Sequence, residues 1–287
     1  MQQEQTKSIF VAIVGRPNVG KSSLLNRMVG EKVAIVTAKP QTTRTRITGI
    51  LTRGAVQYVF LDTPGIHRPR TRLGERMAKA TADSVAEVDA VVMLFEPYGE
   101  LTEAEQALVE DIRVKKVPAL AAVNKTDTLK KETDLAVRMQ FLEKLGVFRG
   151  VLPLCVSEDR GCTELLDALL PFAVESPHYF PDDAYTDMPE KALVAEVLRE
   201  KMLLNLRDEI PHGTAVTVER FKERGDKDII DIDVNIYCEK KSHKGMIIGK
   251  GGQMLKKIAS EARVECEEFL GARVNLQCWV KTKDDWR

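Results

Sequence analysis

Apolar and polar positions alternate with two different periods along the first 174 residues. Short, β-branched apolar runs predict strands at residues 9–14, 46–52, 56–61, 90–95, 118–123 and 151–156. Between these runs, apolar residues recur at helical spacing near residues 21–29, 74–87, 102–115, 131–145 and 163–174. This alternation predicts an α/β domain whose mostly parallel, six-stranded sheet carries helices on both faces. A turn at Arg53, Gly54 and Ala55 predicts a hairpin, so one edge strand should be antiparallel.

The pattern changes after residue 175. Residues 176–189 hold three prolines and show no periodicity, which predicts a linker between one domain at 1–175 and another at 190–287. Beyond the linker we expect an amphipathic helix at 190–208 and two strands at 214–222 and 229–238. A glycine-rich loop at 249–252, helices up to about 269 and a last strand at 273–281 should follow. This order predicts a separate, smaller α+β domain.

Composition adds limits rather than a function. The 43 basic and 43 acidic residues cancel, so any attraction to nucleic acid must come from a local patch. The five cysteines form no C-x-x-C pair, which favours free thiols in a reducing cytosol over disulfides or a zinc site. The first residues include no apolar leader, and the apolar runs are of strand length. We therefore expect a cytoplasmic protein, with peripheral membrane contact left open.

The segment from Gly15 to Ser22 fits the phosphate-binding pattern G-x-x-x-x-G-K-[ST]. It lies between a predicted strand and a predicted helix, as this pattern requires. Its glycines allow backbone N–H groups to surround phosphates, and the helix N-terminus favours anions. Lys21 would reach the β- and γ-phosphates and Ser22 would bind Mg²⁺. The alternative is a glycine-rich turn that happens to contain a lysine.

Two further motifs follow predicted strands. Asp62 begins Asp-Thr-Pro-Gly, in which the carboxylate could bind the hydrated Mg²⁺ and the Gly65 N–H could approach a γ-phosphate. Asn124 begins Asn-Lys-Thr-Asp, in which the Asp127 carboxylate could accept both N1–H and the 2-amino group of guanine. The Lys125 stem could cover the base, and Asn124 could tie this segment to the phosphate loop. Each tetrapeptide alone is common in turns, but the three motifs in this order indicate a guanine nucleotide.

The three segments resemble translation-factor-type GTPases, and the loop Gly-Arg-Pro-Asn-Val-Gly-Lys-Ser is similar to the Era branch of that family. The resemblance implies a first switch loop at Gln41–Arg44, in which Thr43 matches the Mg²⁺-binding threonine beside Ser22 and Asp62. It also implies a guanine-binding backbone at Ser157 and Glu158, although Glu158 stands where the family usually has alanine. The implied nucleotide-binding residues are Gly15, Arg16, Pro17, Asn18, Val19, Gly20, Lys21, Ser22, Ser23, Asp62, Thr63, Pro64, Gly65, Asn124, Lys125, Asp127, Ser157 and Glu158.

The expected catalytic residues are Asn18, Thr43 and Gly65. Ile66 stands where Ras-like enzymes have the glutamine that orients water, so slow intrinsic hydrolysis is expected. The resemblance implies that Asn18 binds K⁺, which would supply positive charge to the transition state. A structural asparagine in a tight turn is the alternative. Seven arginines lie near the switch loops, and they are either solvated loop charges or contacts to RNA or a partner that depend on the bound nucleotide. They are Arg44, Arg46, Arg53, Arg68, Arg70, Arg72 and Arg76.

Residues 249–252 form a G-x-x-G signature within 240–257, a stretch with six lysines and no acidic residue. The alternative is a simple turn that starts a helix and has no role in binding. With the surrounding elements the segment resembles a type II KH domain, which clamps single-stranded nucleic acid. The implied RNA-binding residues are Lys244, Ile248, Gly249, Lys250, Gly251, Gly252, Lys256 and Lys257. Ile247, Ile248 and Leu255 could line the groove or the core, and we expect Trp279 in the core rather than stacked on a base.

A GTPase domain followed by a KH domain resembles the Era family over nearly the whole chain. The resemblance implies binding to the 3′ region of 16S ribosomal RNA, maturation of the 30S subunit, a nucleotide-controlled switch and a monomer. A GTPase of the tRNA-modifying branch is one alternative. An RNA-binding assembly factor with an idle or very weak GTPase site is another. A regulator associated with the inner membrane is a third.

Overall fold

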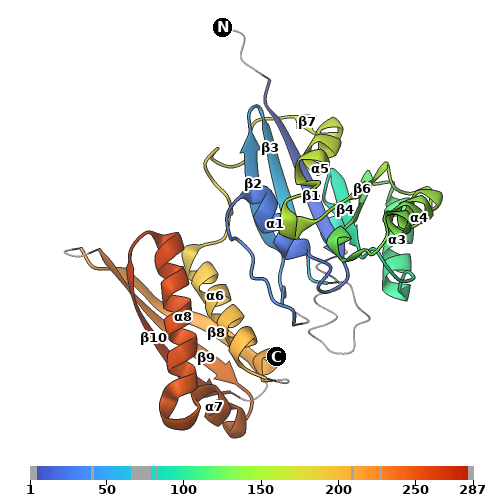
Figure 1. The fold of residues 1–287 in the computed structure, drawn as a ribbon. Helices are drawn as coiled ribbons and strands as arrows, with labels where there is room; N and C mark the ends of the chain where they lie inside the picture. The colour runs from blue at the N-terminus through green and yellow to red at the C-terminus, as the bar shows by residue number, and fades with distance from the viewer. Residues whose placement is uncertain are drawn as a thin grey trace. The chain divides into compact units, whose positions relative to one another are not determined.

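The structure is a computed structural model that describes residues 5–39, 42–65, 79, 81, 83–207, 210–225 and 228–283. The chain forms two compact units, Met1–Asp187 and Met188–Arg287 (Figure 1). Among the described residues, no helix combines the length and apolarity needed to cross a bilayer. All five cysteines are free, as expected.

The first unit is built on one sheet with the order β2-β3-β1-β4-β5-β6. Parallel pairing joins β1 (Lys7–Gly15), β3 (Val56–Asp62), β4 (Ala90–Phe95), β5 (Ala119–Val123) and β6 (Gly150–Pro153). The edge strand β2 (Ile47–Arg53) is antiparallel to β3, which confirms the predicted hairpin. A short seventh strand, β7 (Val174–Glu175), pairs with β1 and was not predicted. Every residue of β4 and β5 is buried because both faces of the sheet are covered.

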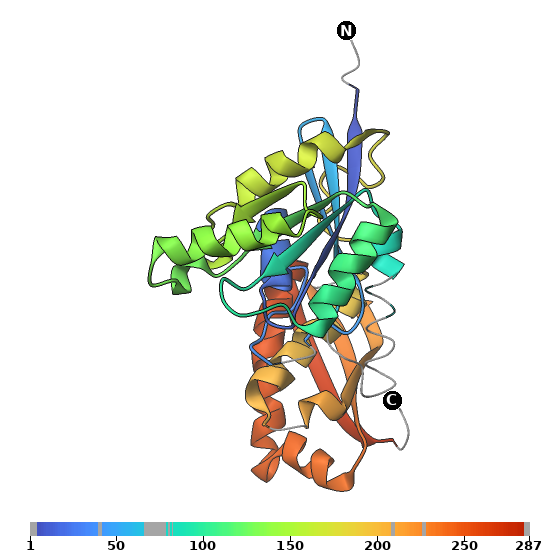
Figure 2. The ribbon, with the colours of Figure 1, turned by 90° about the vertical axis from the view of Figure 1, so that its right-hand side faces the viewer.

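Helices cover both faces of this sheet (Figure 1 and Figure 2). On one face lie α1 (Lys21–Val29) and α5 (Cys162–Leu169). On the other, α3 (Glu103–Lys115) and α4 (Glu132–Lys144) pack against alternate residues of β1, β4 and β5. Short 3₁₀ turns occupy Thr126–Thr128, Val156–Glu158 and Leu170–Phe172. Of the helix predicted at 74–87, residues 79, 81 and 83–86 are helical, and residues 74–78, 80 and 82 lie outside the described residues.

Residues 176–187, here called the strap, are fastened to the first unit. The fully buried side chain of Gln57 donates to Phe180 O at 2.9 Å and accepts the N–H groups of Tyr179 and Phe180 at 2.8 and 3.0 Å. Near the strap's end, Thr186 donates its hydroxyl to a β2 carbonyl at 2.7 Å. The boundary between the units therefore falls at residue 187, near the end of the predicted linker rather than at its start.

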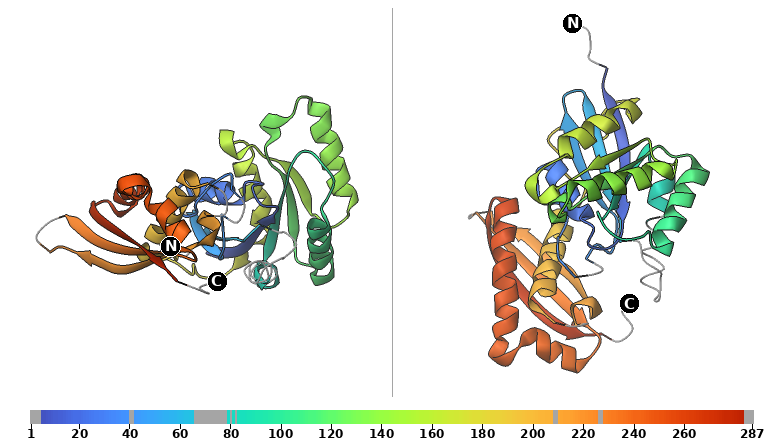
Figure 3. Two further views of the ribbon diagram at one scale, coloured as in Figure 1. Left: turned by 90° about the horizontal axis from the view of Figure 1, so that it is seen from below. Right: turned by 45° about the vertical axis from the view of Figure 1, so that its right-hand side comes forward.

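In its described residues, the second unit pairs a three-stranded sheet with three α-helices. Its elements are α6 (Glu190–Asn205), β8 (Thr214–Glu223), β9 (Ile229–Cys238), α7 (Lys241–Ile248), α8 (Gln253–Leu270) and β10 (Arg273–Thr282), with 3₁₀ turns at Pro211–Gly213 and Lys250–Gly252. In the order β10-β9-β8, β10 is parallel and β8 antiparallel to β9. The long helices α6 and α8 lie side by side over one face, where apolar residues of all three strands form the core (Figure 3).

Two predictions for this unit are wrong. The glycine-rich loop separates α7 from α8, whereas the sequence placed both helices after it; Met246, Ile247 and Ile248 form an apolar run too short to distinguish a helix from a strand. Trp279 is 44% exposed rather than in the core. Its neighbours Cys278 and Val280 pack against the core, so the two-residue period of a strand places Trp279 on the face that the helices leave open.

The strap carries a titratable contact that predicts a pH effect on stability. The Nδ1 atom of His178 lies 2.6 Å from the Asp182 carboxylate, and Nε2 lies 3.2 Å from the Ala55 carbonyl. The hydrogen bond to Asp182 raises the pKa of His178 above its usual value, with a smaller contribution from Ala55, against the effect of burial. Only the protonated ring donates from both nitrogens.

We expect the strap to be held more firmly at low pH. Because the folded-state pKa is raised, the added stability is full below about pH 6.5 and is lost as the pH rises through the folded-state pKa. The fall in melting temperature caused by His178→Gln should therefore be larger at about pH 5.5 than at about pH 8.5. The measurement is thermal unfolding of both proteins across this range. An equal difference at the two pH values would contradict the assignment.

Candidate nucleotide site and nucleic-acid interface

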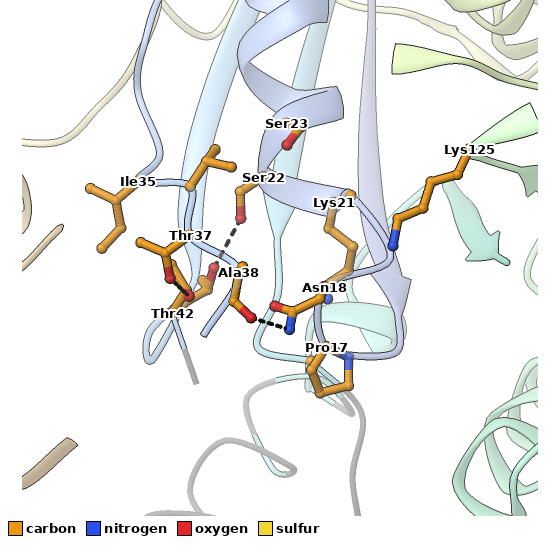
Figure 4. A pocket seen from close by; sticks show the side chains of 14 residues that line it. Pro17, Asn18, Lys21, Ser22, Ser23, Ile35, Thr37, Ala38, Thr42 and Lys125 are labelled. Atoms are coloured by element: carbon orange, nitrogen blue, oxygen red, sulfur yellow. Dashed lines mark hydrogen bonds between the residues drawn. The ribbon is translucent and has the colours of Figure 1, made fainter. Parts of the chain in front are cut away.

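The phosphate loop connects β1 to α1, as the sequence predicts. Gly20 at its end has a φ of 106°, and a Cβ atom there would lie only 2.3 Å from the Asn124 amide nitrogen. Only glycine allows this close approach. The loop borders a cavity of about 350 Å³ that the segment before β2 lines from the other side (Figure 4).

Lys21 lies inside the curve of the loop. Its ammonium group donates to the carbonyls of Gly15 and Arg16 at 3.2 and 2.9 Å, and only 5% of the residue is exposed. Burial lowers the pKa of Lys21 to about 8, and the charge of Asp62 acts in the opposite direction. Burial and these two hydrogen bonds therefore hold the ammonium group within the phosphate loop.

Three oxygen-bearing side chains from separate segments meet beside the loop. The Asp62 Oδ2 atom accepts from the Ser22 hydroxyl at 2.6 Å and from the Thr43 hydroxyl at 3.3 Å, and the two hydroxyl oxygens are 3.0 Å apart. Burial raises the pKa of Asp62, although Lys21 and the two hydroxyl groups oppose this shift. Within the part of the chain that the structure describes, no donor reaches the buried Asp62 Oδ1 atom. These residues fit Mg²⁺, which prefers such oxygen ligands.

Asn124 connects the turn at Val156–Glu158 to the phosphate loop. Its amide nitrogen donates to Val19 O at 2.8 Å, which confirms the predicted tie. Its amide oxygen accepts Val156 N–H at 3.2 Å, a second tie that the sequence did not predict. The side chain is buried, so both contacts are shielded from water. The predicted guanine-binding backbone at Ser157 and Glu158 therefore starts beside the phosphate loop.

The other two members of the motif have partners that the sequence did not predict. The Lys125 ammonium pairs with Glu96 at 2.8 Å, which leaves its stem beside the cavity (Figure 4). The Asp127 carboxylate, on an exposed residue, accepts from the thiol of the buried Cys155 at 3.2 Å. Neither Glu96 nor Cys155 belongs to a motif that could have identified it.

Several predicted site residues use their side chains elsewhere. The Arg16 guanidinium donates to the buried Glu105 carboxylate at 2.7 Å. The Thr63 hydroxyl donates to the β1 carbonyl of Ile13 at 2.9 Å, and the Glu158 carboxylate pairs with Arg160. In all three residues the side chain has a partner within the protein. Gln41, Ile66 and the arginines at 68, 70, 72 and 76 lie outside the described residues.

Asn18 contacts the segment before β2 from the tip of the phosphate loop. Its amide nitrogen donates to Ala38 O at 2.7 Å (Figure 4). Its φ of 61° lies in the left-handed region that asparagine tolerates, which suits the structural interpretation. The amide oxygen, the atom that a cation would need, is at the opposite end of the group. Both interpretations of Asn18 therefore stay open.

In the second unit, residues 249–252 form a tight turn between α7 and α8. Gly251 has a φ of 58°, and a Cβ atom there would meet nothing within 4 Å. The loop backbone is therefore open on that side, at the N-terminus of an 18-residue helix. Lys250, Lys256 and Lys257 are exposed around it. Ile247 is fully buried and Ile248 packs partly against the core, as does Leu255.

Comparison with known proteins agrees with this geometry. Residues 10–125 match the family described as 50S ribosome-binding GTPase, and residues 209–287 match the KH domain family. A protein named GTPase Era from Clostridioides difficile (strain 630) is 45% identical over 281 residues, which cover 98% of this chain and 95% of that protein. The chain belongs to the Era family of GTPases.

Other members of the family extend the comparison. GTPase Era from Caldicellulosiruptor saccharolyticus is 46% identical over 282 residues, which cover 98% of this chain and 94% of the relative. Two solved Era structures each match with a TM-score of 0.93 at 33% identity, over 98% of this chain and 95% of theirs. One is an Aquifex aeolicus Era variant bound to GDP and AlF₄⁻, and the other is Era in complex with MgGDPNP and nucleotides 1506–1542 of 16S ribosomal RNA. The chain therefore combines the GTPase domain and the KH domain of this family.

Proposed function

We propose that this GTPase binds the 3′ region of 16S ribosomal RNA through its KH domain and assists maturation of the 30S subunit. The observation that carries the proposal is the open glycine loop between α7 and α8, which is surrounded by exposed lysines in a chain of zero net charge. The Era complex with 16S ribosomal RNA nucleotides supports it. Nucleotide state would control RNA binding. We also predict a monomeric, cytoplasmic protein.

The loop suits a phosphate backbone for a physical reason. Without a side chain at Gly251, nucleic acid can approach the backbone N–H groups closely, and the N-terminus of α8 favours the phosphate charge. The lysines at 250, 256 and 257 add a local attraction that salt should weaken.

A substitution in the loop tests this interface. Gly251→Asp introduces a carboxylate where a phosphate is expected and should weaken binding of single-stranded RNA by about tenfold or more. GTP hydrolysis without RNA should not change, because the substitution lies in the other unit. Binding is measured by titrating RNA of the 16S 3′-terminal sequence, with GTP or GDP present.

The matched control for this experiment is Gly271→Asp. Gly271 has a similar φ of 63° and open space around it, but it ends α8 rather than starting it. The control carries the same charge and backbone strain and should retain RNA affinity. Equal losses in the two variants would show a general effect of charge, and no loss at Gly251 would exclude the loop as the RNA clamp.

In the first unit we assign Asp127 to the guanine base and Lys21 to the β- and γ-phosphates. Ser22, Thr43 and Asp62 would hold Mg²⁺, which neutralises charge that develops on the phosphate oxygens. The Gly65 N–H is assigned to the γ-phosphate. The hydrogen bonds that join Ser22 and Thr43 to the buried Asp62 and the position of Lys21 support these roles.

The base assignment can be tested by changing its chemistry. Asp127→Asn replaces an acceptor with an amide that can donate to the 2-carbonyl group of xanthine. The affinity for GDP should fall about a hundredfold, because two hydrogen bonds to a charged group are lost, while the affinity for XDP should rise. Equilibrium binding of both nucleotides measures the change. A variant that still prefers GDP would contradict the role of Asp127.

For catalysis we propose that Asn18 binds K⁺ through its amide oxygen beside the developing charge. Turnover should be about tenfold or more faster in K⁺ than in Na⁺ at equal ionic strength. Asn18→Gly should remove the difference, because glycine keeps the left-handed backbone and lacks the ligand. Multiple-turnover phosphate release in each salt measures it. If Asn18→Gly retained the K⁺ response, the residue would be structural only.

A further inference from the structure

The thiol of Cys155 lies between the two segments assigned to the guanine base. Its Sγ atom is 3.2 Å from Asp127 Oδ1 and 3.3 Å from the Ser157 hydroxyl oxygen. Cys155 itself is fully buried. One side chain therefore contacts both the carboxylate that would accept from the base and the turn that would donate to it.

The backbone of Cys155 is also fixed by hydrogen bonds. Its N–H and carbonyl exchange two hydrogen bonds of 3.0 Å with Arg160, and the carbonyl also accepts Glu158 N–H at 3.1 Å. These bonds close the loop 155–160 on itself. The backbone that carries the thiol is thus held by hydrogen bonds that do not involve Asp127.

This contact matters because guanine requires a defined carboxylate orientation. To accept from both N1–H and the 2-amino group, the two carboxylate oxygens must face the base edge together. Rotation about the last torsion of an aspartate side chain is broad, so the orientation needs an external restraint. Each carboxylate oxygen has two lone pairs, so Oδ1 can accept the thiol and a base N–H at once.

We propose that Cys155 is a positioning residue that sets guanine specificity by holding the Asp127 carboxylate through a thiol hydrogen bond. The inference rests on the proposed role of Asp127. A positioning role of Cys155 differs from a space-filling role in its effect on different nucleotides. Loss of packing would weaken all purine nucleotides equally, whereas loss of the restraint penalises most the base that uses both carboxylate oxygens.

Inosine nucleotides measure that difference, because hypoxanthine keeps N1–H and lacks the 2-amino group. We define selectivity as the Kd for IDP divided by the Kd for GDP. In Cys155→Ala and Cys155→Val the donor is absent, and selectivity should fall about threefold to fivefold. In Cys155→Ser a hydroxyl donor replaces the thiol, and selectivity should stay at or above the wild-type value.

Cys162→Ala is the matched control. Cys162 is a second buried cysteine of the same unit, in the first turn of α5, and it should leave selectivity unchanged. Thermal unfolding checks that each variant is folded. If both donor-free variants unfold, infrared spectroscopy replaces them. The S–H stretching band of Cys155 is identified as the band that is absent in Cys155→Ser, and it is then measured in the wild-type protein. That band should shift when GDP binds.

The outcomes separate the inference from the function on which it rests. Unchanged selectivity in Cys155→Ala and Cys155→Val, an equal loss of affinity for both nucleotides, or an S–H band insensitive to GDP would overturn the role of Cys155. If Asp127→Asn also failed to shift preference from GDP to XDP, the base assignment itself would fall. A normal shift in Asp127→Asn with unchanged selectivity in the cysteine variants would remove the inference alone.

Discussion

The buried side-chain amide of Asn124 is the contact on which the geometry of the nucleotide site depends. It donates to Val19 in the phosphate loop and accepts from Val156 at the start of the turn Val156–Glu158. A buried donor or acceptor without a partner costs about 1–3 kcal/mol, so losing this amide would disturb two loops at once. Gly20 is required for the same reason, because any side chain there would occupy the space of the amide.

The consequence is that the phosphate loop and the turn at Val156–Glu158 are placed relative to each other by the protein itself. Gly20, Lys21 and Ser22 follow Val19 in that order, and Ser157 follows Val156. The ends of the parallel strands β1, β5 and β6 bring the phosphate loop, Asn124 and the turn at Val156 to one edge of the sheet. Ligand sites in open α/β sheets form at that edge.

The same topology explains how much could be predicted from the sequence. Strand-end motifs are readable because buried parallel strands appear as continuous apolar runs, and each motif follows one of them. The contacts of Glu96 and Cys155 could not be predicted, since they join residues 28 or 29 positions apart with no motif of their own. Glu105 is an intermediate case. Thr102 and Glu105 have the spacing of a capping box, which the structure contains, but nothing in that spacing indicates that the carboxylate also binds Arg16.

The strap changes where the polypeptide can be divided. A fragment that ended at Glu175, where the composition shifts, would lose the hydrogen-bond partners of the buried Gln57 amide. It would also lose the Tyr179 ring, whose centroid lies 5.1 Å from that of Phe10. A fragment that continued to Asp187 would retain them. Proline-rich composition here marks a segment that gains its order from the sheet beside it. The C-terminal boundary of the isolated GTPase unit thus lies after Thr186, the last strap residue that hydrogen-bonds to the sheet, rather than at the end of the last predicted helix.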